Sequence, residues 1–336
     1  MQKAIIKIRI TAYVLLYSAI VSAQEPQLSQ FYASPVFTNP AFAGSERKLR
    51  IVGSVRNQYT ALKNSFKTSV FSIDGYSQKF NGGLGLLACF DVAGDGLLRT
   101  INLSGIYSYN MSVNRDWSVN ASLQGSIIQR SYDATKLRFG DQLNEFAGYT
   151  GLPSGDLKNM NVQGRVFSNF SSGFLAYSDN FYGGIAVHNL FEPNQSLMDN
   201  NYNNSQVLLR RRYTVHSGLN LYLSRSRYKI DKMILSPNIL FMQQQSFYQV
   251  NLGMYFKNKA LTIGSWLRQT SRNSDAIIIL VGLKLPAFRV GYSYDATISK
   301  SRTSMGGSHE LSMAFQIKIN TKTPIHRSKY IKCPDL

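Results

Sequence analysis

Residues 117–127 read Trp117-Ser118-Val119-Asn120-Ala121-Ser122-Leu123-Gln124-Gly125-Ser126-Ile127, and every second position is apolar or glycine. The intervening side chains are serine, asparagine and glutamine. Successive side chains of an extended chain point to opposite faces, so this stretch predicts a β-strand with one apolar and one polar face. The apolar face holds Trp117, Val119, Leu123 and Ile127.

The same alternation recurs from Leu49 to Lys318. It predicts about fourteen strands, and single-chain bacterial membrane barrels have an even number of strands. The predicted strands are centred near residues 54, 71, 87, 104, 123, 173, 186, 217, 238, 252, 264, 280, 291 and 314.

Two all-β architectures fit alternation: a soluble sandwich and a transmembrane antiparallel β-barrel. The predicted strands reach about ten residues, as a tilted membrane strand requires, whereas strands of soluble sheets average nearer six. Tyrosine and phenylalanine recur at strand ends, where an interfacial girdle would lie. These features favour the barrel, with Trp117, Val119, Leu123 and Ile127 facing lipid. A hydrated lumen would then tolerate Ser122→Arg but the lipid face would not tolerate Leu123→Arg.

The N-terminus has the pattern of a secretory signal peptide over residues 1–23. Lys3, Lys7 and Arg9 flank an apolar run over residues 10–21, and small residues end at Ala23. The mature chain is expected to begin at Gln24. Downstream there is no uncharged apolar run of about 18 residues, so helical membrane spans are not predicted.

The mature chain divides into three predicted parts. Residues 24–47 do not alternate and are expected to plug the lumen or to pack on its periplasmic mouth; residues 48–318 form the barrel, and residues 319–336 form a basic tail. An even strand count predicts that both ends lie on the periplasmic side. Large loops are expected at 131–161, 191–207 and 296–308, and tight turns at Asn81-Gly82 and Asp179-Asn180.

The chain carries a formal charge of +19. Its basic residues are spread along strands and turns, and a secreted chain does not meet cellular DNA, so nucleic acid is not a predicted partner. Anionic lipid or an acidic protein fits this charge better. The two cysteines, Cys89 and Cys333, either pair in an oxidising compartment or remain unpaired thiols.

No catalytic, metal-binding or cofactor-binding motif is readable. The histidines His188, His216, His309 and His326 lack the spacing of a metal site. His216 is expected to be a hydrated lumen side chain, and His309-Glu310 a pair at the barrel rim. The glycines of Gly82-Gly83-Leu84-Gly85 lack the helix that follows a dinucleotide-binding loop and alternate as a strand. We therefore expect neither catalysis nor a cofactor; an outer-membrane hydrolase would need a triad that is not found.

A resemblance adds to this interpretation. The run from Glu25 to Pro35 and the run from Asn39 to Ser45 resemble the opening of the PorP/SprF family, outer-membrane proteins of the type IX secretion and gliding machinery of Bacteroidota. The likeness continues to Cys333-Pro334 in order along the chain. The family-motif positions, with no role assigned to them, are Gln27, Gln30, Phe31, Pro35, Asn39, Pro40, Gly44, Arg56, Asn57, Gln58, Tyr294 and Asp295.

The resemblance implies an outer-membrane barrel that works with periplasmic ring and motor components, and for some members with a secreted surface adhesin. It implies no catalysis. The leading hypothesis is therefore a non-enzymatic protein that anchors or docks machine components or an adhesin, and the alternative is a small-solute channel. A partner could dock on Lys322, Arg327, Lys329 and Lys332 of the tail; alternatively, these residues contact anionic lipid headgroups.

Overall fold

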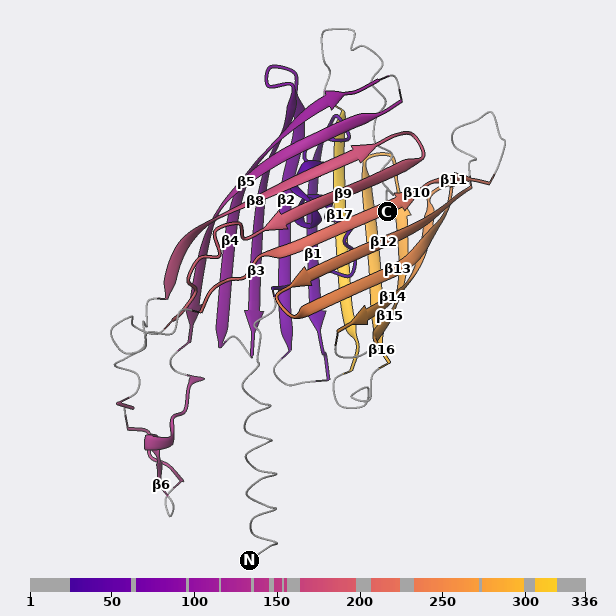
Figure 1. The fold of residues 1–336 in the computed structure, drawn as a ribbon. Coiled ribbons are helices and arrows are strands. Elements are labelled where there is room, and N and C mark those ends of the chain that lie inside the picture. The colour runs from indigo at the N-terminus through magenta and orange to yellow at the C-terminus, as the bar shows by residue number, and fades with distance from the viewer. Residues whose placement is uncertain are drawn as a thin grey trace, which may run out of the picture.

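The computed structural model describes residues 25–61, 65–94, 97–114, 116–133, 136–144, 148–152, 154–155, 164–197, 207–223, 233–271, 274–298 and 306–318. Within these ranges fourteen antiparallel strands close into a barrel (Figure 1). The predicted fold class and strand count are confirmed, and each predicted centre lies within a strand.

The strands of the barrel follow one another around the wall in chain order. They are β1 (Lys48–Gln58), β2 (Phe66–Ser77), β3 (Gly82–Ala93), β4 (Leu98–Ser112), β5 (Ser118–Tyr132), β8 (Arg165–Tyr177), β9 (Phe181–His188), β10 (Arg212–Leu219) continued by β11 (Leu221–Tyr222), β12 (Ile234–Gln244), β13 (Phe247–Asn258), β14 (Leu261–Thr270), β15 (Ser274–Lys284), β16 (Phe288–Thr297) and β17 (Ser308–Lys318). The barrel closes because β1 pairs with β17, and β10 with β12. The described ranges contain no helix long and apolar enough to cross a membrane.

Strand β5 shows how the alternation is used. Leu123 and Ile127 are 65% and 62% exposed on the outer face, whereas Ser122 and Gln124 are buried inside the barrel. Apolar side chains on the outer face of an isolated barrel stay exposed to water. In a bilayer, the same side chains contact the hydrocarbon. The prediction that the apolar face points away from the lumen is therefore confirmed for this strand.

The two ends of the barrel differ in their connections. One end, the long-loop rim, carries the segments that follow β1, β3, β5, β9, β12, β14 and β16, including the residues between Tyr132 and Arg165 and between His188 and Arg212. The short-turn rim carries tight connections such as residues 78–81 and 178–180, as predicted. The predicted loop at 131–161 contains a small hairpin, β6 (Leu143–Asn144) and β7 (Gly148–Tyr149), which extends beyond the barrel wall in Figure 1.

The described ends of the chain lie at opposite rims, so the expectation that both ends share one side is wrong for these residues. Glu25 contacts Asn189, Arg212 and Gln244, all at strand ends on the long-loop rim. Lys318 ends β17 opposite Lys48 on the short-turn rim. The even strand count fixes where β1 begins and β17 ends, but the segment before β1 runs back through the lumen.

Because the lumen is buried, an arginine on either face of β5 should destabilise the barrel. Leu123→Arg should cost about 2–4 kcal/mol because it exposes a cation to the bilayer midplane. Ser122→Arg should also be poorly tolerated, contrary to the expectation for a hydrated lumen, because Ser122 is 4% exposed and its hydroxyl donates to the Gly173 carbonyl. Unfolding of the purified barrel measures both effects. Thr100→Arg, in the half-buried lining of a lumenal cavity, is the control that should cost little. Full tolerance of Ser122→Arg would contradict the buried lumen.

Candidate functional site

The lumen is occupied by the chain itself. Residues 25–47, called the plug from here on, run from the long-loop rim to the start of β1 at the short-turn rim. From Leu28 to Gly44 almost every plug residue is buried, and Gln30, Asn39, Ala41 and Phe42 are fully so. A polypeptide segment therefore fills the middle of the barrel.

Two short helical turns give the plug its shape. Helix α2 (Pro35–Thr38) and the 3-10 turn η1 (Pro40–Phe42) both begin with proline. Proline suits the first helical position because its ring fixes φ and no N–H is needed there. Asn39 precedes η1 and its side-chain oxygen accepts from the Ala41 N–H at 2.9 Å, as an N-cap does. The motif positions Pro35, Asn39 and Pro40 are thus explained by the local geometry.

The plug packs on two opposite walls of the barrel. On one side Phe31, Tyr32 and Phe42 join a buried cluster with residues of β8, β9 and β12–β15. Phe31 lies edge-to-face on Trp266, with ring centroids 4.7 Å apart. On the other side Leu28, Val36 and Ala43 pack on side chains of β2, β3 and β4. Burying these apolar surfaces stabilises the plug in the lumen by the same effect that stabilises a protein core.

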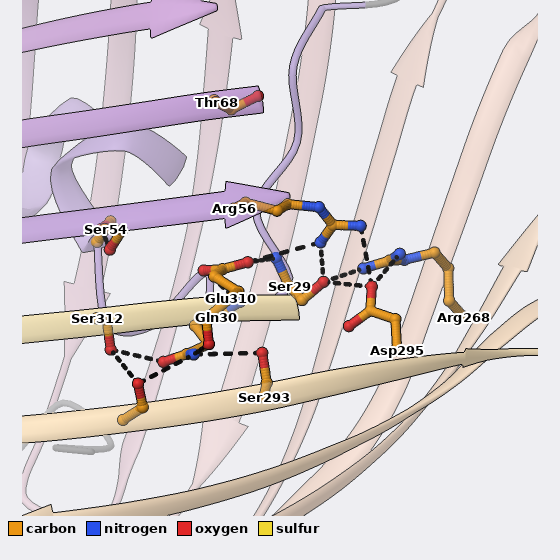
Figure 2. A network of polar contacts seen from close by, with 12 residues as sticks. Ser29, Gln30, Ser54, Arg56, Thr68, Arg268, Ser293, Asp295, Glu310 and Ser312 are labelled. Carbon is orange, nitrogen blue, oxygen red and sulfur yellow. Dashed lines mark hydrogen bonds and ion pairs between the residues drawn. The ribbon is translucent and has the colours of Figure 1, made fainter. Parts of the chain in front are cut away.

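A polar network fastens the long-loop half of the plug to the wall (Figure 2). The Ser29 hydroxyl donates to Asp295 and accepts from Arg268 at 2.9 Å, and Arg56 also donates to it. Asp295 pairs with both guanidinium groups, each at 2.9 Å. The Ser29 N–H donates to Glu310 at 2.6 Å. Two cations and two carboxylates thus meet out of water, where each charge needs its partners.

Gln30 extends this network along β16 and β17. Its amide nitrogen donates to the Glu310 carbonyl at 2.9 Å and to the Ser293 hydroxyl at 3.2 Å, and its amide oxygen accepts from Ser312 at 2.6 Å (Figure 2). A Cβ at Gly291 would lie 2.7 Å from that amide oxygen, so only glycine leaves room there. Both amide atoms of Gln30 therefore have hydrogen-bond partners in the wall, on β16 and β17.

Asn39 fastens the middle of the plug to β8, β9 and β10. Its amide donates to the carbonyls of Phe174 and Ile185, and it lies 3.0 Å from Nε2 of His216. His216 is 1% exposed and stacks on Phe42. The expectation of a hydrated His216 is wrong, because the plug covers the lumen face on which it lies.

At the short-turn rim the plug backbone touches the wall backbone. Gly44 has φ +67° and donates its N–H to Asp74 at 2.9 Å. A Cβ at Gly83 would overlap the Ala43 carbonyl and lie 2.7 Å from the Gly44 nitrogen. Arg50 holds Asp74 and Glu46 at 2.9 and 3.0 Å in a second buried ion network. Glycine at both positions allows this close approach.

The structure brings together most of the motif positions. Gln30, Phe31, Pro35, Asn39, Pro40 and Gly44 belong to the buried plug, and Arg56 and Asp295 lie in the wall against it. Gln27, in the plug, and Gln58, at the end of β1, line a cavity on the long-loop side of the buried part of the plug. Asn57 and Tyr294 lie on the outer face of their strands, and the Tyr294 ring packs on His309. These last two positions do not belong to the plug contact.

Several residues of this contact were not singled out as site residues from the sequence: Ser29, Arg268, Ser293, Glu310, Ser312 and Gly291. Two further glycines, Gly173 and Gly184, also belong to it, because a Cβ at either position would overlap the Asn39 side chain. One signal was available, because Arg268 is a cation on the lumen-facing parity of a strand. The expected His309–Glu310 rim pair is wrong. Glu310 is 1% exposed in the network, whereas Nδ1 of His309 lies 2.7 Å from the Tyr292 hydroxyl outside the barrel.

A cavity of about 710 Å³, called the vestibule, lies between the plug and the long-loop rim. Such a volume is within the usual range of ligand sites. Its lining is mixed: Leu87, Ile128 and Phe167 are apolar, whereas Arg130 and Arg212 are cationic. Outside the vestibule, in the segment after β9, the Glu192 carboxylate accepts a hydrogen bond from the backbone N–H of Arg211, which lowers the pKa of Glu192. Glu192 also pairs with Arg210.

Several other residues named in the sequence analysis lie outside the described residues. Cys89 is a buried free thiol in β3, whereas Cys333 lies outside the described residues. Lys322, Arg327, Lys329 and Lys332 also lie outside them. No group of three or more His, Cys, Asp or Glu side chains that could hold a metal ion occurs among the described residues.

The fold and its contents define a class: an outer-membrane β-barrel whose lumen is filled by its own N-terminal segment. The chain belongs to the PorP/SprF family, described as type IX secretion system membrane proteins, whose family model matches residues 20–315. The predicted family and the outer-membrane localisation are thereby confirmed. No curated protein matches the sequence.

Among solved structures, the chain is similar to Acinetobacter baumannii Omp33, with 10% identity, 82% of this chain and 100% of that chain covered, and a TM-score of 0.43. It is also similar to the Pseudomonas putida toluene transporter TodX, with 10% identity, 89% and 96% covered, and a TM-score of 0.45. The monoaromatic hydrocarbon channel CymD has 11% identity, 87% and 94% covered, and a TM-score of 0.47. At these scores the likenesses add nothing to the architecture described above.

Proposed function

We propose that this type IX secretion membrane protein is a non-enzymatic docking platform, which anchors periplasmic machine components or a secreted surface adhesin. The observation that carries the proposal is the plug. It is hydrogen-bonded to β1, β2, β4, β5, β8–β10, β14, β16 and β17, and it packs on opposite walls. A lumen occupied in this way supports a role for the rims and not for a central pore.

The size of the barrel supports the same proposal. Barrel diameter grows with strand number, and fourteen strands leave only a modest bore even without a plug. A folded protein needs far more room. A secreted protein would therefore pass elsewhere and meet this barrel at its surface.

The rims suggest where partners dock. Bacterial outer-membrane barrels carry short turns on the periplasmic side and longer loops outside. By this rule the short-turn rim, where β17 ends, faces the periplasm, and we expect the tail that follows β17 to meet the periplasmic components there. The long-loop rim, with the vestibule, faces the cell exterior and any surface adhesin.

The tail should be needed for the periplasmic partner. Deleting residues 320–336 is expected to leave the barrel folded and to abolish recovery of ring or motor components in a pull-down, because the basic tail speeds and stabilises encounter with an acidic surface. Association should also weaken as salt rises. Replacing Lys322, Arg327, Lys329 and Lys332 with glutamine should act like the deletion.

A matched control neutralises basic residues on the opposite rim. Glutamine at Lys67, Arg99, Arg138 and Arg210 removes the same charge but should leave recovery of the periplasmic partner intact. Normal recovery with the truncated chain would rule out tail docking and leave contact with lipid headgroups as the role of the tail.

The alternative function, a small-solute channel, predicts a steady ion current through the purified wild-type barrel in a planar bilayer. The docking platform predicts little current, because plug atoms occupy the lumen. An open-channel current in the wild type would overturn the platform and support the channel.

A further inference from the structure

The first described residue of the plug is held by a small receptor in the vestibule wall. The Glu25 carboxylate accepts from the Asn189 amide at 2.8 Å and pairs with Arg212 at 2.9 Å. The Glu25 N–H lies 3.5 Å from the Gln244 amide oxygen. Arg212, Asn189 and Gln244 are each less than 10% exposed. The wall thus binds both the carboxylate and the backbone N–H of Glu25.

The charges around the vestibule show that this receptor needs an anion. Arg56 and Arg268 are balanced by Asp295 and Glu310. Arg212 has its ion pair with Glu25 alone among the described residues, and its Nε atom has no hydrogen-bond partner there. Because a buried cation without a counterion is costly, Arg212 favours an anion in the place of Glu25 whenever Glu25 leaves.

The arm that carries Glu25, residues 25–27, is less buried than the part of the plug that follows it. Residues 25–27 are half-buried, whereas Leu28 and the residues that follow are buried and Ser29 and Gln30 are bonded to the wall. Residues 25–27 can therefore leave the receptor without moving the network at Ser29. The vestibule beside them offers apolar side chains, including Leu87, Ile128 and Phe167, to an incoming segment.

We propose that Arg212, Asn189 and Gln244 form a receptor for an acidic, partly apolar segment of a partner polypeptide, and that Glu25 occupies it until the partner displaces Glu25. A peptide occupant is favoured over a small acid, because the receptor already binds a glutamate residue by both its side chain and its backbone N–H. The inference deepens the proposed docking function and rests on it. It places a second docking site on the rim opposite the end of β17.

The test uses the purified mature protein in detergent and a fluorescein-labelled decapeptide of alternating glutamate and leucine. Fluorescence anisotropy should show weak binding to the wild type. Glu25→Ala should bind roughly tenfold more tightly, because a charge-assisted contact is no longer contested. Binding should fall as salt rises, and the peptide of alternating glutamine and leucine should bind neither protein well.

Two further variants separate the receptor from general charge. Glu192→Ala removes one carboxylate from the same rim, at an exposed pair with Arg210, and should leave the affinity unchanged. Adding Arg212→Gln to Glu25→Ala should abolish the gain, and this double variant leaves no unpaired charge to unfold the chain. Equal tightening in Glu192→Ala, or no tightening in Glu25→Ala, would overturn the receptor. Because β17, which precedes the tail, ends at the other rim, either result leaves the tail-deletion test of docking unaffected.

Discussion

Replacing Gly83 with valine should raise the fraction of barrels with a displaced plug and so raise the ion current through the lumen. A Cβ at this position overlaps the Ala43 carbonyl and lies 2.7 Å from the Gly44 nitrogen, so plug backbone and wall backbone cannot both keep their places. Overpacking costs about 1–3 kcal/mol, and about 3 kcal/mol raises the displaced population roughly a hundredfold. Valine also suits a strand, so the wall itself should persist.

The measurement is conductance of single purified barrels in a planar bilayer, with a thermal melt to show that the barrel is folded. Gly105→Val is the matched control, because this glycine lies on the neighbouring strand β4 and a Cβ there meets nothing within 4 Å. It should conduct as little as the wild type. Equal, low conductance of a folded Gly83→Val barrel would show that the plug tolerates the clash or does not block the lumen.

The barrel could be predicted from sequence because a period of two is local information. The polarity of Leu123 and of Gln124 alone predicts that they lie on opposite faces of β5. One face is then expected to contact lipid and the other to line the lumen. Repeating that reasoning along the chain placed every strand. The same reasoning assumed that a polar inner face is wet, and it failed at His216 and Ser122 because a segment far away in sequence covers them.

The plug contacts could not be predicted in the same way. The Ser29 hydroxyl and Asp295 are 266 residues apart, and no periodicity links them. Gly83 was interpreted only as a strand glycine, because the sequence does not show which backbone approaches it. Motif positions such as Gln30 and Asn39 were marked by the family resemblance, but their roles emerged only when Gly291, Gly173 and Gly184 were seen beside them.

Removing Asp295 should destabilise the protein more than removing a surface acid. Asp295→Ala leaves the guanidinium groups of Arg56 and Arg268 with Glu310 as the remaining carboxylate in the network, where both cations are almost fully buried. Breaking a buried pair in this way costs about 3–5 kcal/mol, whereas an exposed pair contributes about 0–1 kcal/mol. Denaturant unfolding in detergent measures the difference, with Glu192→Ala as the surface control.

A second substitution tests whether unpaired charge is the cause. Arg268→Met added to Asp295→Ala restores one cation, Arg56, facing one carboxylate, Glu310, at 3.5 Å. Methionine fills much of the same volume without charge, so part of the lost stability should return even though a further polar group has been removed. Additive destabilisation by the two changes would mean that Asp295 acts through its hydrogen bond to Ser29 and not through charge balance. In that case Ser29→Ala alone should reproduce most of the loss.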